Sequence, residues 1–336
     1  MKIIVPMAGM GKRMRPHTLK VPKPLIPVAG KPIVQRLAED IASIVDGPLE
    51  NIAFIVGPSQ QFFGPQVQEH LLAVAKKLGA TGSIHVQSEA LGTAHAIYQA
   101  EQLLSGNVII AFADTLFRAD FKLDSSKDSI IWVQQVKDPS AYGVVKMDDN
   151  SVITHFIEKP TEFVSDLAII GIYFFKDGAN LRNELQYLID QNITDKGEYQ
   201  ITDALENMKL KGLKFYPGKV DEWLDCGNPK AAIHANKRVL DFSENKHERS
   251  GLKLDNATII EPCYIGANVQ LSNCTIGPYV SLGDGTVVSD SLLKNTIVQN
   301  NTTLKNADLE DSMIGNNVTY KGGSKQVSIG DYSTIG

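Results

Sequence analysis

Ile3-Ile4-Val5 leads almost directly into Met7-Ala8-Gly9-Met10-Gly11-Lys12-Arg13, and the expected architecture follows from this short run. Three apolar residues, all β-branched, are typical of a strand that is buried on both faces. A Gly-x-Gly turn after such a strand lets backbone N–H groups approach an anion, and the two cations that follow neutralise its charge. The run therefore predicts a buried strand that ends in an anion-binding loop.

Charge is distributed unevenly around this loop. The chain has 336 residues and a net charge of -5, yet its first acidic residue is Glu39, and eight lysines and arginines precede it. A protein that binds nucleic acid would be expected to present a broad basic face. A local positive pocket on an acidic chain instead indicates a small polyphosphate ligand, and no nucleic-acid partner is expected.

The composition of the chain indicates its number of domains, its location and the state of its cysteines. A hydrophobic content of 43% over 336 residues is enough for a sizeable core and predicts two domains. No apolar run approaches the roughly 20 residues that span a bilayer, so no membrane association is expected, and the N-terminal residues do not resemble a signal peptide. The three cysteines form no Cys-x-x-Cys pair, which predicts reduced, buried thiols in a cytoplasmic protein.

Strand-like and helix-like segments alternate over about the first 240 residues. Short apolar or β-branched runs predict strands at residues 3–5, 51–56, 84–87 and 108–112. Apolar residues at helical spacing predict helices between them, one starting at Pro32 and one ending at Gly79. This alternation predicts an α/β domain with a Rossmann-like, mainly parallel sheet flanked by helices. Ligands of such sheets bind at the carboxyl ends of the strands, where Asp114 would join the Gly9–Arg13 loop.

From about Asp255 the spacing of the apolar residues changes. Apolar residues recur every five or six positions from Ile260 to Ile314, often followed by Gly or Asn. This period resembles the hexapeptide repeat of a left-handed parallel β-helix. The chain stops on a fresh repeat, Ile335-Gly336, without a polar cap, so we expect another subunit to cover this end in a homo-oligomer. The expected domains are residues 1–240 and 255–336, joined by a linker at 241–254.

The glycine loop alone does not identify a ligand. It lacks the glycine that a dinucleotide fingerprint would need at Met14, and it lacks the ending of a Walker A loop. The continuation Lys20–Pro32 is more specific. Five prolines between Pro16 and Pro32 stiffen the chain, so Lys23 can be held near a phosphate at little entropic cost.

With these motifs the chain resembles the sugar-1-phosphate nucleotidylyltransferases. Their signature is a Gly-rich loop ending in arginine, then a Pro-Lys-Pro-Leu-like segment and Gly-Lys-Pro, found here at Gly9–Arg13, Pro22–Leu25 and Gly30–Pro32. Further matches follow in order over residues 1–240: Gln87–Ala94, Asp114, Tyr142–Val145, Phe156–Pro160, Gly171–Phe175, Gly197–Asp203 and Trp223–Gly227. Long members of the family carry a C-terminal left-handed β-helix. The resemblance implies Mg²⁺-dependent transfer of a nucleotidyl group from dTTP or UTP to a hexose 1-phosphate, with glucose 1-phosphate expected, and release of pyrophosphate.

The resemblance also implies roles for individual residues. The catalytic set is Arg13, Lys23, Asp114, Lys159 and Asp225, with Asp114 and Asp225 as the Mg²⁺ ligands. The nucleotide would contact Ala8, Gly9, Gly11, Arg13, Lys23, Gln87, Gly92 and Thr93, where the Gln87 amide and the Gly92 backbone would read the edge of uracil or thymine. The sugar phosphate would contact Tyr142, Gly143, Glu158, Lys159, Gly171 and Lys196.

Departures from the family pattern leave alternatives open. The loop is one residue shorter than in thymidylyltransferases and has the length found in UDP-glucose pyrophosphorylases, so UTP–glucose-1-phosphate uridylyl transfer is one alternative. Mannose-1-phosphate guanylyl transfer is another, since Ala168-Ile169-Ile170 leaves the sugar undefined. An inactive regulatory homologue, acting through assembly, could lose any of four site residues without losing its fold, but all four are present: Arg13, Lys23, Asp114 and Asp225. An acyltransferase working from the β-helix would need a histidine, and residues 255–336 contain none.

Overall fold

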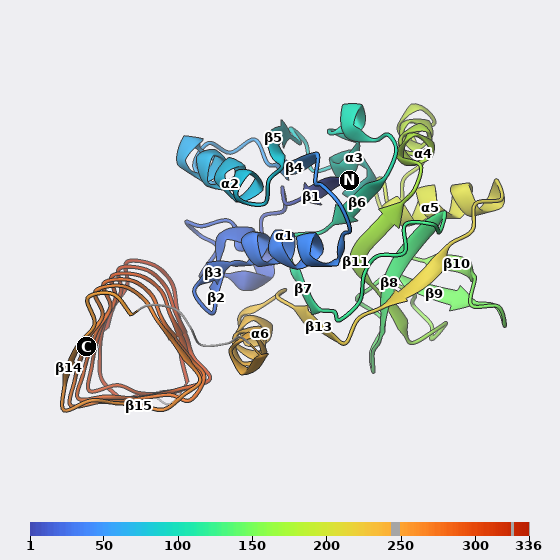
Figure 1. The fold of residues 1–336 in the computed structure, drawn as a ribbon. Coiled ribbons are helices and arrows are strands. Elements are labelled where there is room, and N and C mark those ends of the chain that lie inside the picture. Colours follow the sequence, from blue (N-terminus) through green and yellow to red (C-terminus); the bar gives the residue numbers. More distant parts are fainter. Residues whose placement is uncertain (243–248, 324–325, 336) are drawn as a thin grey trace. The chain divides into compact units, whose positions relative to one another are not determined.

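A computed structural model describes residues 1–242, 249–323 and 326–335 of the chain (Figure 1). Contacts within the chain group the residues into two compact units. The first unit consists of Met1–Gly9 and Leu37–Trp223, and the second of Met10–Arg36 and Leu224–Gly336. The boundaries expected from the sequence remain predictions, and residues 243–248 of the expected linker, like Gly336, lie outside the described residues.

A mixed sheet forms the centre of the first unit. Its strand order is β10-β9-β11-β6-β1-β4-β5, with β8 beside β11 and β12 beside β8. Strands β5, β4, β1 and β6 run parallel, whereas β11 runs antiparallel to β6, β8 and β9. The bounds are β1 Lys2–Pro6, β4 Asn51–Val56, β5 Thr81–Val86, β6 Val108–Ala111, β8 Ser129–Gln135, β9 Val144–Met147, β10 Ile153–Ile157, β11 Leu167–Phe175 and β12 Tyr216–Lys219. The predicted Rossmann-like α/β class is confirmed.

Helices cover the sheet and supply the core. They are α1 Ile33–Ile44, α2 Pro65–Lys77, α3 Thr93–Tyr98, α4 Gly178–Asp190 and α5 Ile201–Leu210, with a short 3₁₀ helix at Glu101–Leu103 (η3). Two further 3₁₀ helices, Lys12–Met14 (η1) and Lys23–Leu25 (η2), belong to the second unit. Alternate residues of β1 point to opposite faces of the sheet. Ile4 packs in the cluster that contains Leu185 and Leu205 of α4 and α5, and Ile3 on the other face is equally buried. Both faces of the central strands are therefore covered, as their unbroken apolar runs predicted.

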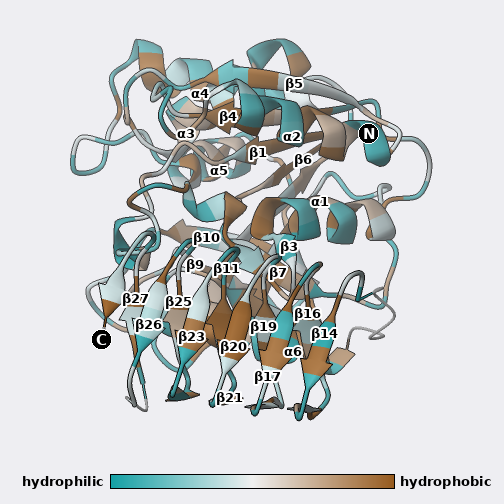
Figure 2. Ribbon diagram, turned by 90° about the vertical axis from the view of Figure 1, so that its left-hand side faces the viewer, coloured by the Kyte–Doolittle hydropathy of each residue, from teal (hydrophilic) through white to brown (hydrophobic). Residues whose placement is uncertain are grey.

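The second unit contains the predicted left-handed β-helix, which is confirmed as its fold. Short parallel strands stack in three sheets (Figure 2). The sheets are β14 Lys253–Asp255, β17 Gln270–Ser272, β20 Val287–Ser289, β23 Thr303–Lys305, β26 Thr319–Lys321 and β28 Thr334–Ile335; β15 Thr258–Ile259, β18 Thr275–Ile276, β21 Leu292–Lys294 and β24 Asp308–Glu310; and β16 Cys263–Ile265, β19 Val280–Leu282, β22 Ile297–Val298, β25 Met313–Ile314 and β27 Ser328–Ile329.

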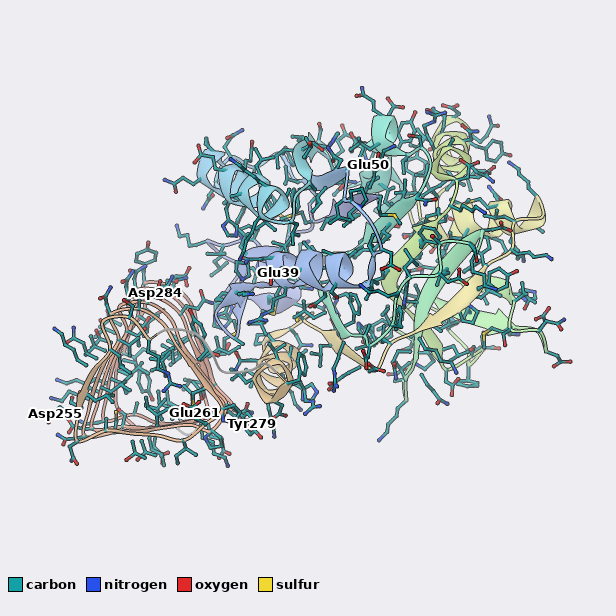
Figure 3. The ribbon with its side chains drawn as sticks, in the orientation of Figure 1. Glu39, Glu50, Asp255, Glu261, Tyr279 and Asp284 are labelled. Carbon is teal, nitrogen blue, oxygen red and sulfur yellow. The ribbon has the colours of Figure 1, made fainter. Side chains whose placement is uncertain are left out.

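The coils of the β-helix are slightly shorter than three full hexapeptides. Leu254, Leu271, Val288, Leu304 and Tyr320 stack in register, so successive coils take 17, 17, 16 and 16 residues. This explains why the apolar period in the sequence alternates between five and six. The corners, marked by Asp255, Tyr279 and Asp284 in Figure 3, carry many residues with positive φ, mostly Asn and Asp. These side chains tolerate the left-handed conformation better than other non-glycine residues.

The second unit also includes α6 (Pro229–Phe242) and the N-terminal segment Met10–Arg36. In that segment β2 (Pro27–Val28) and β3 (Lys31–Pro32) form a hairpin. Its two-residue loop, Ala29-Gly30, has φ values of 45° and 80°, the signature of a type I′ turn. Two further strands lie at predicted motifs: β7 (Thr115–Arg118), in the first unit, follows Asp114, and β13 (Glu222–Asp225) overlaps the Trp223–Gly227 motif. No helix within the described residues is long and apolar enough to cross a membrane.

Candidate active site

In the second unit, the glycine loop passes directly over Lys23. Gly11 has a φ of 57°, in the left-handed region that favours glycine. A Cβ at Gly11 would lie 2.9 Å from the Cβ of Lys23 and 3.1 Å from Cγ2 of Thr18. The Thr18 hydroxyl donates a hydrogen bond of 2.8 Å to the Gly11 carbonyl and closes the contact. Glycine is therefore required at this position, and Lys23, only 7% exposed, is held beneath the loop.

The same unit brings Arg13 close to Asp225. Asp225 ends β13, and its Oδ1 accepts a hydrogen bond of 2.8 Å from the backbone N–H of Gly227. A Cβ at Gly227 would lie 2.9 Å from Asp225 Oδ1 and 3.3 Å from Nη2 of Arg13. The Asp225 carboxylate and the Arg13 guanidinium, which come from the last and the first of the matched motifs, thus border the small space that Gly227 leaves.

In the first unit, Asp114 sits in the turn between β6 and β7. The backbone N–H of Phe112 donates to the carbonyl of Gly171 at 3.0 Å, and the Thr115 hydroxyl donates to the carbonyl of Ile170 at 2.7 Å. These bonds tie both sides of the turn to β11. The half-buried Asp114 is therefore held at the carboxyl end of a central strand, which is where ligands of open α/β sheets bind.

Asp114 and Glu158 both act electrostatically on the hydroxyl of Tyr173. The ring is buried in β11, and burial raises the pKa of the Tyr173 hydroxyl. The negative charges of Glu158 and Asp114 raise this pKa further. Both carboxylates must lie close to the same hydroxyl for this to occur. The first unit thus brings together two predicted site residues from separate motifs.

The predicted sugar-phosphate residues gather around Glu158. A Cβ at Gly143 would lie 3.0 Å from Glu158 Oε2, so the glycine allows the carboxylate to approach the backbone. Lys159 Nζ lies 3.1 Å from Glu158 Oε1, and the Lys159 backbone N–H donates to the Tyr142 carbonyl at 3.1 Å. The Lys159 side chain is 53% exposed, so this ion pair contributes little to stability and its ammonium can meet an incoming phosphate.

The predicted base-reading residues contact each other directly. Gln87 is 6% exposed, and its Nε2 donates to the Gly92 carbonyl at 3.1 Å and lies 3.2 Å from Nδ1 of His95. The amide is therefore fixed in one orientation by the protein. A fixed amide can discriminate between base edges, whereas a mobile one pays entropy on binding.

The motif around Gly92 packs against the motif around Tyr199. The backbone N–H of Tyr199 donates to the Leu91 carbonyl at 2.8 Å, and the N–H of Ala94 donates to the Tyr199 carbonyl at 2.9 Å. Thr93 Oγ1 accepts from the backbone N–H of Ile201 at 2.9 Å. Hydrogen bonds therefore join two segments that are about a hundred residues apart in sequence.

Lys196, also predicted to bind the sugar phosphate, lies in an exposed turn just before the Gly197–Asp203 motif. Its φ is 51°, and the flanking residues Asp195 and Glu198 exchange backbone hydrogen bonds of 2.9 and 3.0 Å. The turn fixes where the backbone of Lys196 lies. Its role toward a ligand stays a prediction.

No role was predicted for Asp203, although this residue ends the matched Gly197–Asp203 motif. Its pKa is raised by burial first, then by the charges of Asp195 and Glu158. Asp203 thus adds a carboxylate to the surroundings of Glu158. The signal that could have found it is its place in the first turn of α5, where an acidic residue favours the helix N-terminus.

By unit, the predicted site residues form two groups. Gly11, Arg13, Lys23 and Asp225 belong to the second unit, and the others, including Ala8, Gly9 and Asp114, belong to the first. The metal pair Asp114 and Asp225 is divided between the units, so its joint geometry remains a prediction. Over residues 1–242, 249–323 and 326–335, no three His, Cys, Asp or Glu side chains gather as a metal site by themselves.

Comparison with known proteins identifies a family and several relatives. The model of the nucleotidyl transferase family matches residues 2–241. Glucose-1-phosphate thymidylyltransferase of Streptomyces antibioticus is 28% identical, with 100% of this chain and 99% of the relative covered. Mannose-1-phosphate guanylyltransferase catalytic subunit beta of Drosophila melanogaster is 30% identical, with 84% of this chain and 71% of the relative covered. A crystal structure of UDP-glucose pyrophosphorylase complexed with UDP-glucose shares the fold, with a TM-score of 0.59, 24% identity, and 72% of this chain and 99% of that chain covered.

Proposed function

The chain belongs to the nucleotidyl transferase family, and from that premise we propose that it transfers a nucleotidyl group from dTTP or UTP to a hexose 1-phosphate. Pyrophosphate is the second product. We take glucose 1-phosphate as the acceptor because the Streptomyces relative that aligns with the whole chain is named for it. Guanylyl transfer to mannose 1-phosphate is the competing candidate, favoured by the name of the Drosophila relative.

The observation that carries this proposal is the arrangement of cations in the second unit. Gly11 lies over the buried Lys23, and Arg13 lies beside Asp225 around Gly227. Backbone N–H groups of a glycine loop together with two cations suit a triphosphate, which carries several negative charges in a short length. A carboxylate among these cations suits a divalent metal that accompanies the triphosphate.

The reaction is an in-line displacement at the α-phosphorus. A phosphate oxygen of the sugar phosphate forms a bond to that phosphorus, the bond from it to the bridging α–β oxygen breaks, and pyrophosphate leaves with the electron pair. Catalysis of this type consists mainly of positioning and charge neutralisation. In this proposal Lys23 stabilises charge on the α-phosphate, and Arg13 holds the β- and γ-phosphates that depart.

Glu158 and Lys159 would position the acceptor. Glu158 accepts hydrogen bonds from sugar hydroxyls, and Lys159 exchanges its ion pair with Glu158 for the phosphate. Lys159 Nζ and Glu158 Oε1 lie 3.1 Å apart, so the exposed Lys159 side chain would turn away from Glu158 to admit a sugar phosphate between them. Gly143 keeps Glu158 close to the backbone, and the N–H of Ile169 donates to the Gly143 carbonyl at 2.8 Å, which fixes that segment on β11.

The donor set fits Mg²⁺. This ion takes oxygen ligands and commonly uses one or two carboxylates together with waters and substrate phosphates. Asp225 offers a carboxylate that the Gly227 N–H already orients, and Asp114 offers a second at the end of β6. When bound, the ion would neutralise charge that develops on the phosphates.

A pyrophosphate-release assay with Mg²⁺ tests the proposal. It crosses dTTP, UTP, GTP, CTP and ATP with the 1-phosphates of glucose, mannose and N-acetylglucosamine. Turnover with dTTP or UTP and glucose 1-phosphate is expected. Turnover only with GTP and mannose 1-phosphate would replace this reading with guanylyl transfer. No turnover in any combination would contradict the enzymatic proposal and favour a regulatory homologue.

The Gly227→Ala variant tests whether Arg13 and Asp225 act together. The φ of Gly227 is not positive, so alanine fits the backbone, but its Cβ would displace two carboxylate oxygens and the guanidinium. We expect kcat/KM for the nucleoside triphosphate to fall roughly tenfold or more, since misplacement of about 1 Å can cost 10²-fold. The thermal midpoint should change little. Gly323→Ala, where a Cβ would meet nothing closer than the Asn306 carbonyl oxygen at 4.0 Å, is the steric control, because no site role is predicted for Gly323. An unchanged kcat/KM in Gly227→Ala would contradict the assignment.

The Gln87→Leu variant tests base selection. Removing the amide should reduce the preference for dTTP or UTP over GTP by roughly tenfold or more, because buried polar groups enforce discrimination. The ratio of kcat/KM values for the competing triphosphates is the measurement, since loss of stability alone would lower all of them together. Gln135→Leu is the matched control, because the exposed Gln135 amide donates to Asp166 Oδ2 at 2.6 Å and no site role is predicted for it. An unchanged ratio in Gln87→Leu would remove Gln87 from the base site.

Assembly into a homo-oligomer through the β-helix and a cytoplasmic location remain predictions from the sequence.

A further inference from the structure

The segment that carries Arg13 and Lys23 is attached to the β-helix through His17. Nε2 of His17 lies 3.0 Å from Oγ of Ser328, although the two residues are 311 positions apart. Ser328 begins β27, in one of the last coils that the structure describes. The neighbouring Pro16 packs on the same coil, because a Cβ at Gly330 would lie 3.0 Å from the Pro16 Cβ.

A second attachment lies on the other side of Lys23. Asn236 of α6 is fully buried, and its Oδ1 accepts hydrogen bonds from the Ala29 backbone N–H at 2.9 Å and from the Ser281 hydroxyl at 2.7 Å. Its Nδ2 donates to the Tyr279 carbonyl at 3.3 Å. The segment between His17 and Ala29 is therefore held at both ends by residues of the second unit that follow the α/β domain in sequence.

His17 is buried, so its ring depends on the hydrogen bond with Ser328. The imidazole is 1% exposed, and burial lowers the pKa of His17 to about 4, so the ring is neutral near pH 7. Nδ1 has no hydrogen-bond partner among the described residues. The Ser328 hydroxyl is thus the polar partner of Nε2 on this buried ring. A buried polar group deprived of its partner carries its full desolvation cost.

Short contacts link His17 to the cationic residues. The His17 backbone N–H donates to the Met14 carbonyl at 3.0 Å, and the Met14 N–H donates to the Gly11 carbonyl at 2.9 Å. The adjacent Thr18 donates its hydroxyl to the same Gly11 carbonyl, and Gly11 lies over Lys23. Arg13 lies inside the η1 turn that these bonds close. A shift of His17 would therefore displace the backbone of the whole glycine loop.

We propose that Ser328 of the β-helix is a positioning residue for the nucleotidyl-transfer site, acting through His17 on the loop that holds Arg13 and Lys23. This inference rests on the proposed function. The β-helix is then part of the machinery that orients the triphosphate. Ser328 itself touches no reacting group in this account, so its loss should affect binding and orientation of the triphosphate and leave the sugar phosphate contacts of the first unit intact.

The test compares Ser328→Ala with Ser333→Ala and Ser328→Thr. Ser333 belongs to the same region, but its hydroxyl donates to Gly330 within its own coil at 3.0 Å. Ser328→Ala should lower kcat/KM for the triphosphate roughly five- to tenfold, as expected for loss of one hydrogen bond to a buried group, while KM for the sugar phosphate stays constant. Ser328→Thr restores the hydroxyl and should restore activity, and Ser333→Ala should match the wild type.

Hydrogen exchange supplies a readout that is independent of turnover. In Ser328→Ala, backbone amides of residues 12–19 should exchange faster than in the wild type, and in Ser333→Ala they should not. An active wild type with unchanged exchange and kinetics in Ser328→Ala would overturn the positioning role alone. A wild type that releases no pyrophosphate with any substrate pair would overturn the proposed function, and the positioning role with it, even if exchange responded.

Discussion

Replacing Asp114 with asparagine is expected to reduce pyrophosphate release by about 10³-fold or more while the protein remains folded. A carboxylate that holds a divalent cation supports several kcal/mol of transition-state charge stabilisation, and each 1.36 kcal/mol corresponds to a factor of ten. Asparagine has nearly the same shape, and bonds from the Phe112 backbone N–H and the Thr115 hydroxyl tie the turn to β11. The fold of the turn should therefore survive the substitution.

The measurement is kcat at saturating substrates, together with thermal unfolding of the same sample. Asp120→Asn is the matched control, because Asp120 is an exposed carboxylate just beyond β7. Its removal changes the net charge by the same amount and should leave kcat within about twofold, as befits a surface group. Activity of Asp114→Asn within tenfold of the wild type would refute the metal assignment. A large loss of stability in Asp114→Asn would show a structural role instead.

Replacing Gly92 with alanine is expected to have the largest effect on stability among the glycines assigned to the site. The φ of Gly92 is 104°, where an L side chain is strained, and a Cβ there would lie 2.5 Å from the carbonyl oxygen and 2.7 Å from the nitrogen of Tyr199. Both are backbone atoms, so no side-chain rotation relieves the clash. The backbone bonds that join Leu91 and Ala94 to Tyr199 would have to lengthen. We expect a loss of about 2–4 kcal/mol in the free energy of unfolding.

The matched control separates the cost of backbone strain at a positive φ from the cost of the steric clash with Tyr199. Gly212 has a φ of 95°, yet a Cβ there meets nothing within 4 Å. Gly212→Ala should therefore cost only the backbone strain, about 1–2 kcal/mol. Denaturant titration measures both variants, and a pyrophosphate-release assay should show activity lost only in Gly92→Ala. Equal losses of stability in the two variants would mean that the packing of the Gln87–Ala94 and Gly197–Asp203 motifs is looser than described.

The elements that could be predicted are those specified by local chemistry. The burial of Ile3, Ile4 and Val5, the helical face of α1 and the glycine that ends α2 follow from spacing and from the few conformations that glycine and proline allow. The β-helix was visible because its repeat recurs many times. The strand β5 begins at Thr81, three residues before the apolar run, because pairing with Asn51 of β4 extends it through polar positions.

The remaining features depend on partners that are remote in sequence. The apolar run of β11 contains no signal for its direction, and its antiparallel pairing with β6 is set by tertiary packing. The resemblance identified Arg13 and Asp225 individually, but only the structure shows that Gly227 separates them. His17 appeared in the sequence as one more residue of a proline-rich loop, because its partner Ser328 lies 311 positions away and no local pattern announces it.

The grouping of Met10–Arg36 with Leu224–Gly336 has a consequence for how the protein matures during translation. The loop leaves the ribosome well before Asn236, Ser281 and Ser328, the residues that hold it. At about 5–20 residues per second, a separation of 311 residues corresponds to roughly 15–60 s of synthesis. The strands of the sheet in the first unit are therefore synthesised before the residues that hold this loop. Under the proposed function, the loop would become competent to bind the triphosphate only after the coils that carry Ser281 and Ser328 have formed.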